Sequence, residues 1–123
     1  AVRWRRSTGG AYVYATPAIA DGTVYIGSYN GRFEALGLGS GAMRWSFDAG
    51  GRISGSATVV DGVVYTSILY RPGQPRRTYG LDARTGAVRF RMADGRYSPA
   101  VAAGRTLYLV GVRTLYAHPA PAA

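Results

Sequence analysis

Short runs of apolar and polar residues follow one another along this chain, separated by turns that contain glycine. The run 23–29 is rich in β-branched and aromatic residues, and the run 43–47 alternates apolar with polar positions as a half-buried strand does. Asp21-Gly22 and Asn30-Gly31 stand between runs and favour two-residue hairpin turns. This stretch therefore predicts a four-stranded antiparallel meander. Its strands are expected at residues 16–20, 23–29, 32–36 and 43–47.

The same meander recurs along the chain. Asp21-Gly22 returns as Asp61-Gly62, and Tyr25 returns as Tyr65 and then Tyr108, at successive offsets of 40 and 43 residues. The fourth strand occurs three times, as Ala1-Val2-Arg3-Trp4, Ala42-Met43-Arg44-Trp45 and Ala87-Val88-Arg89-Phe90. Four strands repeated every 40 to 45 residues or so are typical of the blades of a β-propeller. We therefore predict an all-β fold made of propeller blades.

The repeat divides the chain into parts. Residues 1–8 are expected to carry the last strand of a blade, 11–50 and 52–93 to be complete blades, 96–118 to supply three strands of a further blade, and 119–123 to be a frayed tail. The strands of that further blade are expected at 98–102, 106–111 and 113–118. The parts amount to three blades, and the N-terminal strand is the one that the last blade lacks.

Three blades are too few to close a ring, since propellers have about four to eight. An arc of three would leave apolar blade faces and a strand edge exposed to water. We therefore expect either a homodimer, in which two chains exchange strands to close a six-bladed ring, or a longer parent chain that holds the missing blades.

Composition is consistent with an all-β chain and limits the chemistry. The 123 residues include 18 Gly and almost no Glu, Lys or Met, so strong helix formers are scarce. No apolar run approaches the length of about 20 residues that spans a bilayer, and with neither signal peptide nor initiator Met we expect a processed or excised piece. The absence of Cys excludes disulfides and thiolate metal sites. The net charge of +9, carried by arginine alone, favours acidic partners.

Residues 80–90 read Gly-Leu-Asp-Ala-Arg-Thr-Gly-Ala-Val-Arg-Phe, which resembles the Ala-Leu-Asp-Ala-x-Thr-Gly-x-x-x-Trp pattern of the PQQ-like, quinoprotein-type propeller repeats. Residues 35–45 are a weaker copy that lacks the Asp. Asp82 and Thr85 can accept backbone N–H bonds in this turn, and Gly86 can take a positive φ. The resemblance covers nearly the whole chain, whereas the Trp-Asp signature of WD40 repeats is missing.

In that family the aromatic residue at the end of the pattern docks against the neighbouring blade. The resemblance therefore implies interblade packing for Trp4, Trp45 and Phe90.

Quinoprotein dehydrogenases of the same superfamily hold their cofactor with a vicinal disulfide, a calcium ion and a catalytic Asp. This chain has no Cys, and its acidic residues are Glu34 and five Asp that turns explain. His118, the single histidine, has no nucleophile or second metal ligand predicted beside it. We therefore expect no catalytic residues, no cofactor and no metal.

Arginines are the remaining candidates for function. Arg71, Arg76 and Arg77 lie in a segment that replaces the tight turn of the preceding blade and is five residues longer. Loops carry function more often than strands, and guanidinium groups match carboxylates and phosphates. These three residues are our candidate partner-binding site. We interpret the tyrosines as strand packing, which argues against nucleic acid as the partner.

The sequence thus predicts a non-catalytic scaffold or binding module. Relatives with such repeats include outer-membrane assembly lipoproteins and propeller domains outside bacterial kinases, so the resemblance implies an extracytoplasmic or cell-surface location. Two alternatives remain: a propeller segment that binds a polyanion or an acidic protein, and a fragment of a quinoprotein dehydrogenase.

Overall fold

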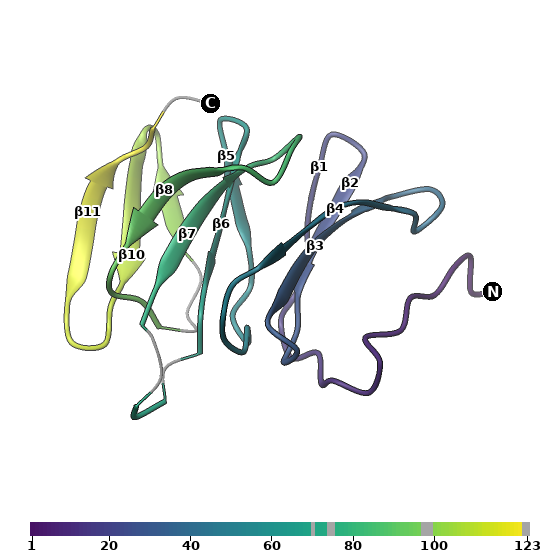
Figure 1. The fold of residues 1–123 in the computed structure, drawn as a ribbon. Coiled ribbons are helices and arrows are strands. Elements are labelled where there is room, and N and C mark those ends of the chain that lie inside the picture. The colour runs from purple at the N-terminus through teal and green to yellow at the C-terminus, as the bar shows by residue number, and fades with distance from the viewer. Residues whose placement is uncertain (70, 74–75, 97–99, 122–123) are drawn as a thin grey trace.

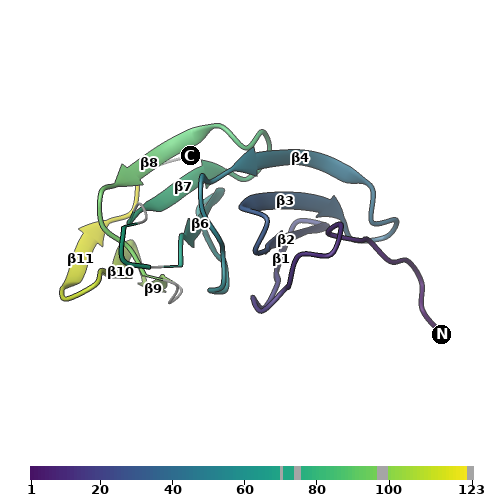
Figure 2. The ribbon, with the colours of Figure 1, turned by 60° about the horizontal axis from the view of Figure 1, so that its bottom comes forward.

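The chain folds into antiparallel sheets that stand side by side in an arc (Figure 1 and Figure 2). The structure, a computed structural model, describes residues 1–69, 71–73, 76–96 and 100–121. Over these residues it contains eleven strands in three sheets and no helix, which confirms the all-β prediction.

Each sheet is a meander in which neighbours in sequence are neighbours in space. The first blade contains β1 (Ala18–Ala20), β2 (Thr23–Gly27), β3 (Arg32–Gly37) and β4 (Met43–Asp48). The second blade contains β5 (Thr58–Val60), β6 (Val63–Ser67), β7 (Thr78–Asp82) and β8 (Val88–Met92). The third sheet contains β9 (Val101–Ala103), β10 (Thr106–Val110) and β11 (Leu115–Pro119).

The first hairpin of each blade has the turn that its sequence predicts. Asp21 has a φ of 46° and Gly22 one of 69°, and Asp61 and Gly62 have 48° and 74°. Two successive residues with positive φ are typical of the type I′ turn, whose twist matches that of the flanking strands.

An aromatic, a small and a second aromatic residue stand side by side on neighbouring strands of each complete blade. The two sets are Tyr25–Ala35–Trp45 and Tyr65–Gly80–Phe90. The ring centroids of the two aromatics lie 5.9 Å apart in the first blade and 6.0 Å apart in the second. The small residue leaves room for both rings, so the set works as one packing unit. In the third sheet Tyr108 pairs with Ala117, and no fourth strand of the described chain pairs with β11.

The hydrophobic core lies between sheets. Phe33 of the first blade and Ile53, Val64 and Leu81 of the second are fully buried in one cluster. Gly27 makes room for Ile53, because a Cβ at Gly27 would overlap its side chain. A second cluster joins the second blade to Leu107 and Leu109 of the third sheet. Burial of apolar side chains between the sheets therefore holds the arc together.

The structure differs from our predictions at both ends of the chain. Residues 1–8 form no strand, because the sheet to which a fourth strand would add does not lie beside them. At the other end, Pro119 belongs to β11 and Ala120 is buried. The frayed tail, predicted at 119–123, therefore does not include these two residues. The backbone N–H of Ala120 donates to the carbonyl of Arg105, which fixes this residue against the β9–β10 turn. Residues 98–99 of the strand predicted at 98–102 lie outside the described residues.

Candidate functional site

The junction between the two complete blades is held by hydrogen bonds to one carbonyl oxygen. The indole Nε1 of Trp45 donates to Ala83 over 3.0 Å, and the hydroxyl of Tyr25 donates to the same oxygen over 3.0 Å. Ala83 and Gly86 lie in the turn between β7 and β8. Gly86 has a φ of +79°, and a Cβ there would lie 2.7 Å from Cε3 of Trp45. The β7–β8 turn therefore forms a close-fitting seat for the indole ring.

Trp4 has the corresponding seat on the first blade, although its segment forms no strand. Its indole Nε1 donates to the carbonyl of Leu38 over 2.9 Å. Gly41 has a φ of +73°, and a Cβ there would lie 2.5 Å from Cε3 of Trp4. Trp4 thus contacts the β3–β4 turn as Trp45 contacts the β7–β8 turn.

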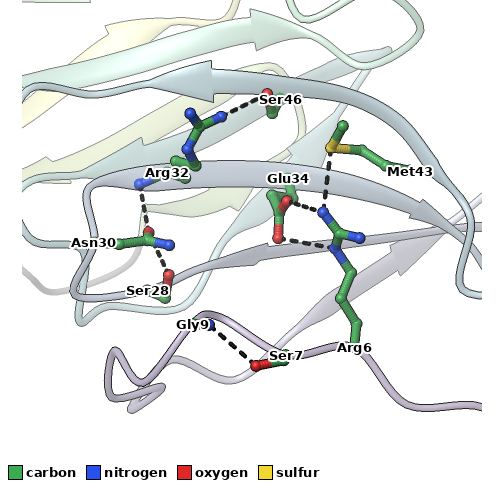
Figure 3. A network of polar contacts seen from close by, with 9 residues as sticks. All are labelled: Arg6, Ser7, Gly9, Ser28, Asn30, Arg32, Glu34, Met43 and Ser46. Carbon is green, nitrogen blue, oxygen red and sulfur yellow. Dashed lines mark hydrogen bonds and ion pairs between the residues drawn. The ribbon is translucent and has the colours of Figure 1, made fainter.

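A bidentate ion pair holds the same N-terminal segment on the first blade (Figure 3). In Figure 3 the guanidinium of Arg6 points at the carboxylate of Glu34 on β3, with Nη2 2.7 Å from Oε2 and Nε 3.3 Å from Oε1. This hydrogen bond raises the pKa of the Arg6 guanidinium. The sulfur of Met43 lies 3.4 Å from the same Nη2. Between the segment and the sheet a mainly apolar recess of about 290 Å³ remains, lined in part by Trp4 and Val13.

Phe90 has different surroundings. Its ring lies 6.0 Å from that of Tyr65 and 5.1 Å from that of His118 on β11, so it contacts the third sheet. The hydroxyl of Tyr65 is buried and, among the described residues, has no hydrogen-bond partner. Burial, with a smaller contribution from the charge of Asp61, raises the pKa of Tyr65 to about 12. Among the described residues, the hydroxyl of Tyr65 thus lacks the carbonyl partner that Tyr25 has at the other junction.

Asp82 begins the turn that seats Trp45. Arg89 donates to its carboxylate with Nη2–Oδ2 at 2.9 Å, and the backbone N–H groups of Arg84 and Thr85 donate to Oδ1. The hydrogen bond from Arg89, followed by that from Arg84, lowers the pKa of Asp82. Asp82, Arg84 and Arg89, together with Arg44 and Asp21, line a cleft of about 470 Å³ beside the blade junction.

The structure does not bring the three predicted loop arginines together. Arg71 lines a recess of about 170 Å³ that it shares with Arg52. Arg77 turns toward the ring of Tyr79, with Cζ 6.0 Å from the centroid, and its Nε is buried. Arg76 lies near Asp94. Burial acts to raise the pKa of Asp94, but the hydrogen bond from Tyr116, together with backbone N–H groups and the charge of Arg76, lowers it. Residues 74–75 of the predicted loop lie outside the described residues.

Sequence reasoning missed Arg52. It follows Gly50-Gly51, and nothing in these neighbouring residues indicates which other loop lies beside it. Arg71 is 19 positions along the chain, and the two residues share one recess because Ile53 pairs with Ile68 and the N–H of Leu69 donates to the carbonyl of Arg52.

The described residues contain no group of three His, Asp or Glu side chains that could hold a metal ion. Over the same part of the chain, no helix has the length and apolarity needed to cross a membrane.

The chain forms antiparallel four-stranded meanders, and an aromatic residue of the fourth strand contacts a turn of the next blade. These features define it as part of a β-propeller with PQQ-like repeats. The chain belongs to the family described as outer membrane protein assembly factor BamB, whose pattern matches residues 1–121. This confirms the resemblance to PQQ-like repeats.

Individual proteins of known name or structure also resemble this chain. The outer membrane protein assembly factor BamB of Moranella endobia is 35% identical over 74 residues, which are 60% of this chain and 17% of that protein. The crystal structure of BamB from Moraxella catarrhalis superposes with a TM-score of 0.73 at 22% identity, over 90% of this chain and 34% of that one. Quinohemoprotein alcohol dehydrogenase from Comamonas testosteroni gives a TM-score of 0.60 at 26% identity, over 64% of this chain and 13% of that one. The chain thus spans a minor part of the bacterial proteins that it matches.

Proposed function

We propose that this chain is a non-catalytic propeller segment that acts as a scaffold or binding module and is completed by further blades. The observation that carries the proposal is the position of Trp4. Its indole is seated on the β3–β4 turn as the fourth-strand residue Trp45 is seated on the β7–β8 turn. This likeness supports residues 1–6 as the fourth strand of a preceding blade.

Exposed apolar side chains at both ends of the arc support this proposal. Val13 and Ile19 are 49% and 61% exposed at the first blade, and Val101 and Leu115 are 60% and 69% exposed on the third sheet. Ile53, the counterpart of Val13 in the second blade, is fully buried at the formed junction. A further blade at each end would remove this apolar surface from water.

The proposed closure joins two chains head to tail. Residues 1–6 of one chain add to the outer edge of β11 of the other, with Trp4 opposite Ala117 and beside Tyr108. That register completes a third set of aromatic, small and aromatic residues, as in the two complete blades. Two chains closed in this way form a six-bladed ring, and the blades of a longer parent chain are the other way to complete it.

Family membership supports a role in assembly rather than catalysis, since the matched family is named for outer membrane protein assembly. It also supports an extracytoplasmic or cell-surface location. The chain spans 17% and 34% of the length of two BamB relatives. That it shares partners with those whole proteins is therefore part of this proposal.

Light scattering coupled to size exclusion tests the closure. A mass near twice 13.1 kDa is expected, and Ala117→Arg should reduce it to that of one chain by blocking the strand register. Arg84→Gln, an exposed change far from both ends, is the matched control and should keep the dimer mass. A folded wild-type monomer at all concentrations would rule out strand exchange and leave the longer parent chain.

The absence of catalysis needs its own test, because a quinohemoprotein dehydrogenase shares the fold. Titration with pyrroloquinoline quinone and calcium, followed by tryptophan fluorescence, should give no saturable binding. Stoichiometric uptake of the quinone would instead favour a dehydrogenase fragment.

A further inference from the structure

The two ends of the meanders differ in charge. Because successive strands run in opposite directions, the β2–β3, β4–β5, β6–β7, β8–β9 and β10–β11 loops all lie at one end, the lower side of Figure 1. These lower loops contain one aspartate, Asp94, and six arginines, at positions 52, 71, 76, 77, 96 and 113. The upper loops contain Arg84, Arg105, Asp21 and Asp61. The lower end is therefore the positive end, which attracts acidic partners.

Three tyrosines cluster at this positive end. The rings of Tyr12, Tyr14 and Tyr29 lie with centroids 5.0 to 6.2 Å apart, and Tyr12 and Tyr14 are 67% and 63% exposed. The structure differs here from our interpretation of the tyrosines as strand packing, because these three lie outside the strands. Large exposed aromatic side chains gathered in one place mark an interaction surface.

Arginines extend this cluster into two adjoining recesses. The guanidinium Cζ of Arg52 lies 5.3 Å from the centroid of Tyr29. Tyr29, Arg52 and Asp48 line a recess of about 370 Å³, and Arg52 and Arg71 line the second, of about 170 Å³. Asp48 is the one acidic side chain lining either recess. We call Tyr12, Tyr14, Tyr29, Arg52 and Arg71 the Tyr/Arg face.

The Tyr/Arg face stays open when a further blade is added. The backbone N–H of Tyr29 donates to the carbonyl of Tyr12, as the N–H of Leu69 donates to the carbonyl of Arg52 one blade further on. Arg52 is therefore the counterpart of Tyr12, and it is exposed although its own blade junction is formed. A blade that covers Val13 would likewise leave Tyr12 exposed.

We propose that the Tyr/Arg face binds an acidic, extended polypeptide segment. The inference rests on the proposed role as a binding module and names the chemistry of its partner. Arginine pairs with carboxylates through two parallel N–H bonds, and a guanidinium already stacked on a tyrosine loses little further freedom when it does so. Tyrosine and arginine are also the residues most enriched at the centres of protein interfaces.

The geometry of the tyrosines favours a polypeptide over a nucleic acid. Their ring planes are inclined to one another by 53° to 74°, so they pack against each other and offer edges and parts of faces. Single-stranded nucleic acids bind where separate aromatic faces let successive bases stack. A ridged aromatic surface beside arginines fits an extended chain whose acidic and apolar side chains lie on the same side, at every second position.

Fluorescence anisotropy with the whole 123-residue chain tests the proposal. The probe is a fluorescein-labelled peptide in which every second residue is in turn acidic (Asp or Glu) and apolar (Val or Leu), with Ser between them, and the comparison peptide has Asn and Gln in place of Asp and Glu. The acidic peptide should bind, and Arg52→Gln should weaken its binding about fivefold or more. The double variant Tyr12→Ser with Tyr14→Ser should weaken binding by about tenfold. Arg84→Gln removes the same charge from the upper end and should change binding by less than about twofold.

The alternatives give different results. Equal losses for Arg52→Gln and Arg84→Gln would reduce the effect to net charge and overturn the assigned face. Tighter binding of an oligothymidylate of matched charge would assign the face to nucleic acid instead. Light scattering separates this inference from ring closure: a monomer that binds the peptide refutes closure alone, and a dimer that does not bind it refutes the Tyr/Arg face alone.

Discussion

The indole nitrogen of Trp45 lies 3.0 Å from the carbonyl oxygen of Ala83, across the junction between the two complete blades. The two residues are 38 positions apart, and the bond links the outermost strand of one blade to a turn of the next. A buried aromatic ring with one polar atom needs such a partner, and the turn supplies it.

Trp45→Phe should destabilise the chain by about 2 kcal/mol, because the smaller ring loses both the hydrogen bond and part of the apolar contact that the indole makes with the turn. Trp4→Phe should cost less than about 0.5 kcal/mol, since Trp4 lies on a more exposed segment. Urea denaturation followed by circular dichroism measures both. Equal losses would show that the two indole seats are energetically alike.

The tyrosine hydroxyls provide a second matched pair. Tyr25→Phe should cost about 1 kcal/mol, because its hydroxyl donates to Ala83 at the blade junction. Tyr65→Phe should be neutral or slightly stabilising, since it removes a buried hydroxyl that lacks a partner among the described residues. The midpoints of urea denaturation compare the two. A clear loss for Tyr65→Phe would mean that this hydroxyl is hydrogen-bonded in solution.

Gly86→Ala tests the close approach of Trp45 to the turn. Gly86 and Gly50 both have a φ of +79°, but a Cβ at Gly86 would lie 2.7 Å from the indole, whereas nothing lies within 4 Å at Gly50. Gly50→Ala should cost about 1 kcal/mol for its backbone conformation alone. Gly86→Ala should cost at least about 1 kcal/mol more than Gly50→Ala, because the indole ring of Trp45 must also shift. Melting temperatures of the two variants reveal the difference.

Asp82 should make stability depend on pH in acid. Arg89 and the backbone N–H of Arg84 lower the pKa of Asp82 in the folded chain below its ordinary value of 3.8. The unfolded chain therefore binds a proton first, so the stabilisation is present above that value and is lost as pH falls through the folded pKa. Asp82→Asn should melt at a temperature that falls less steeply below about pH 5 than that of the wild type.

Arg89→Gln is the control for this pH dependence, because it removes the largest cause of the lowered pKa and keeps the carboxylate. It should also flatten the acid branch. A variant curve that runs parallel to the wild type would mean that Asp82 has the same pKa folded and unfolded.

Sequence reasoning was most successful where the determinants are local. Asp21-Gly22 and Asp61-Gly62 predicted hairpin turns, and the φ angles of these residues agree. The repeat and its quinoprotein-type pattern predicted the family, which is confirmed. The interblade packing of Trp4, Trp45 and Phe90 stays a prediction, and the two indole seats and the ring of His118 beside Phe90 support it.

The candidate site formed by the three loop arginines stays a prediction, and their neighbours are what the sequence did not indicate. Arg71, Arg76 and Arg77 are close in sequence, yet their side chains lie by Arg52, Asp94 and Tyr79 respectively. A loop of this length can turn each side chain differently, and nothing in its own residues indicates which neighbour it will meet.

The sequence by itself determined the hairpin turns and the strands of the three sheets, because alternation of side chains and turn residues act over a few positions. Its repeat pattern indicated the propeller family by resemblance. Only the tertiary structure decided that Tyr12, Tyr14, Tyr29 and Arg52 share one face and that Trp4 is seated like Trp45. The tyrosines and Trp4 contact other segments of the first blade, and Arg52 reaches Tyr29 across a blade junction. Folding within one blade and packing between two sheets therefore set these distances.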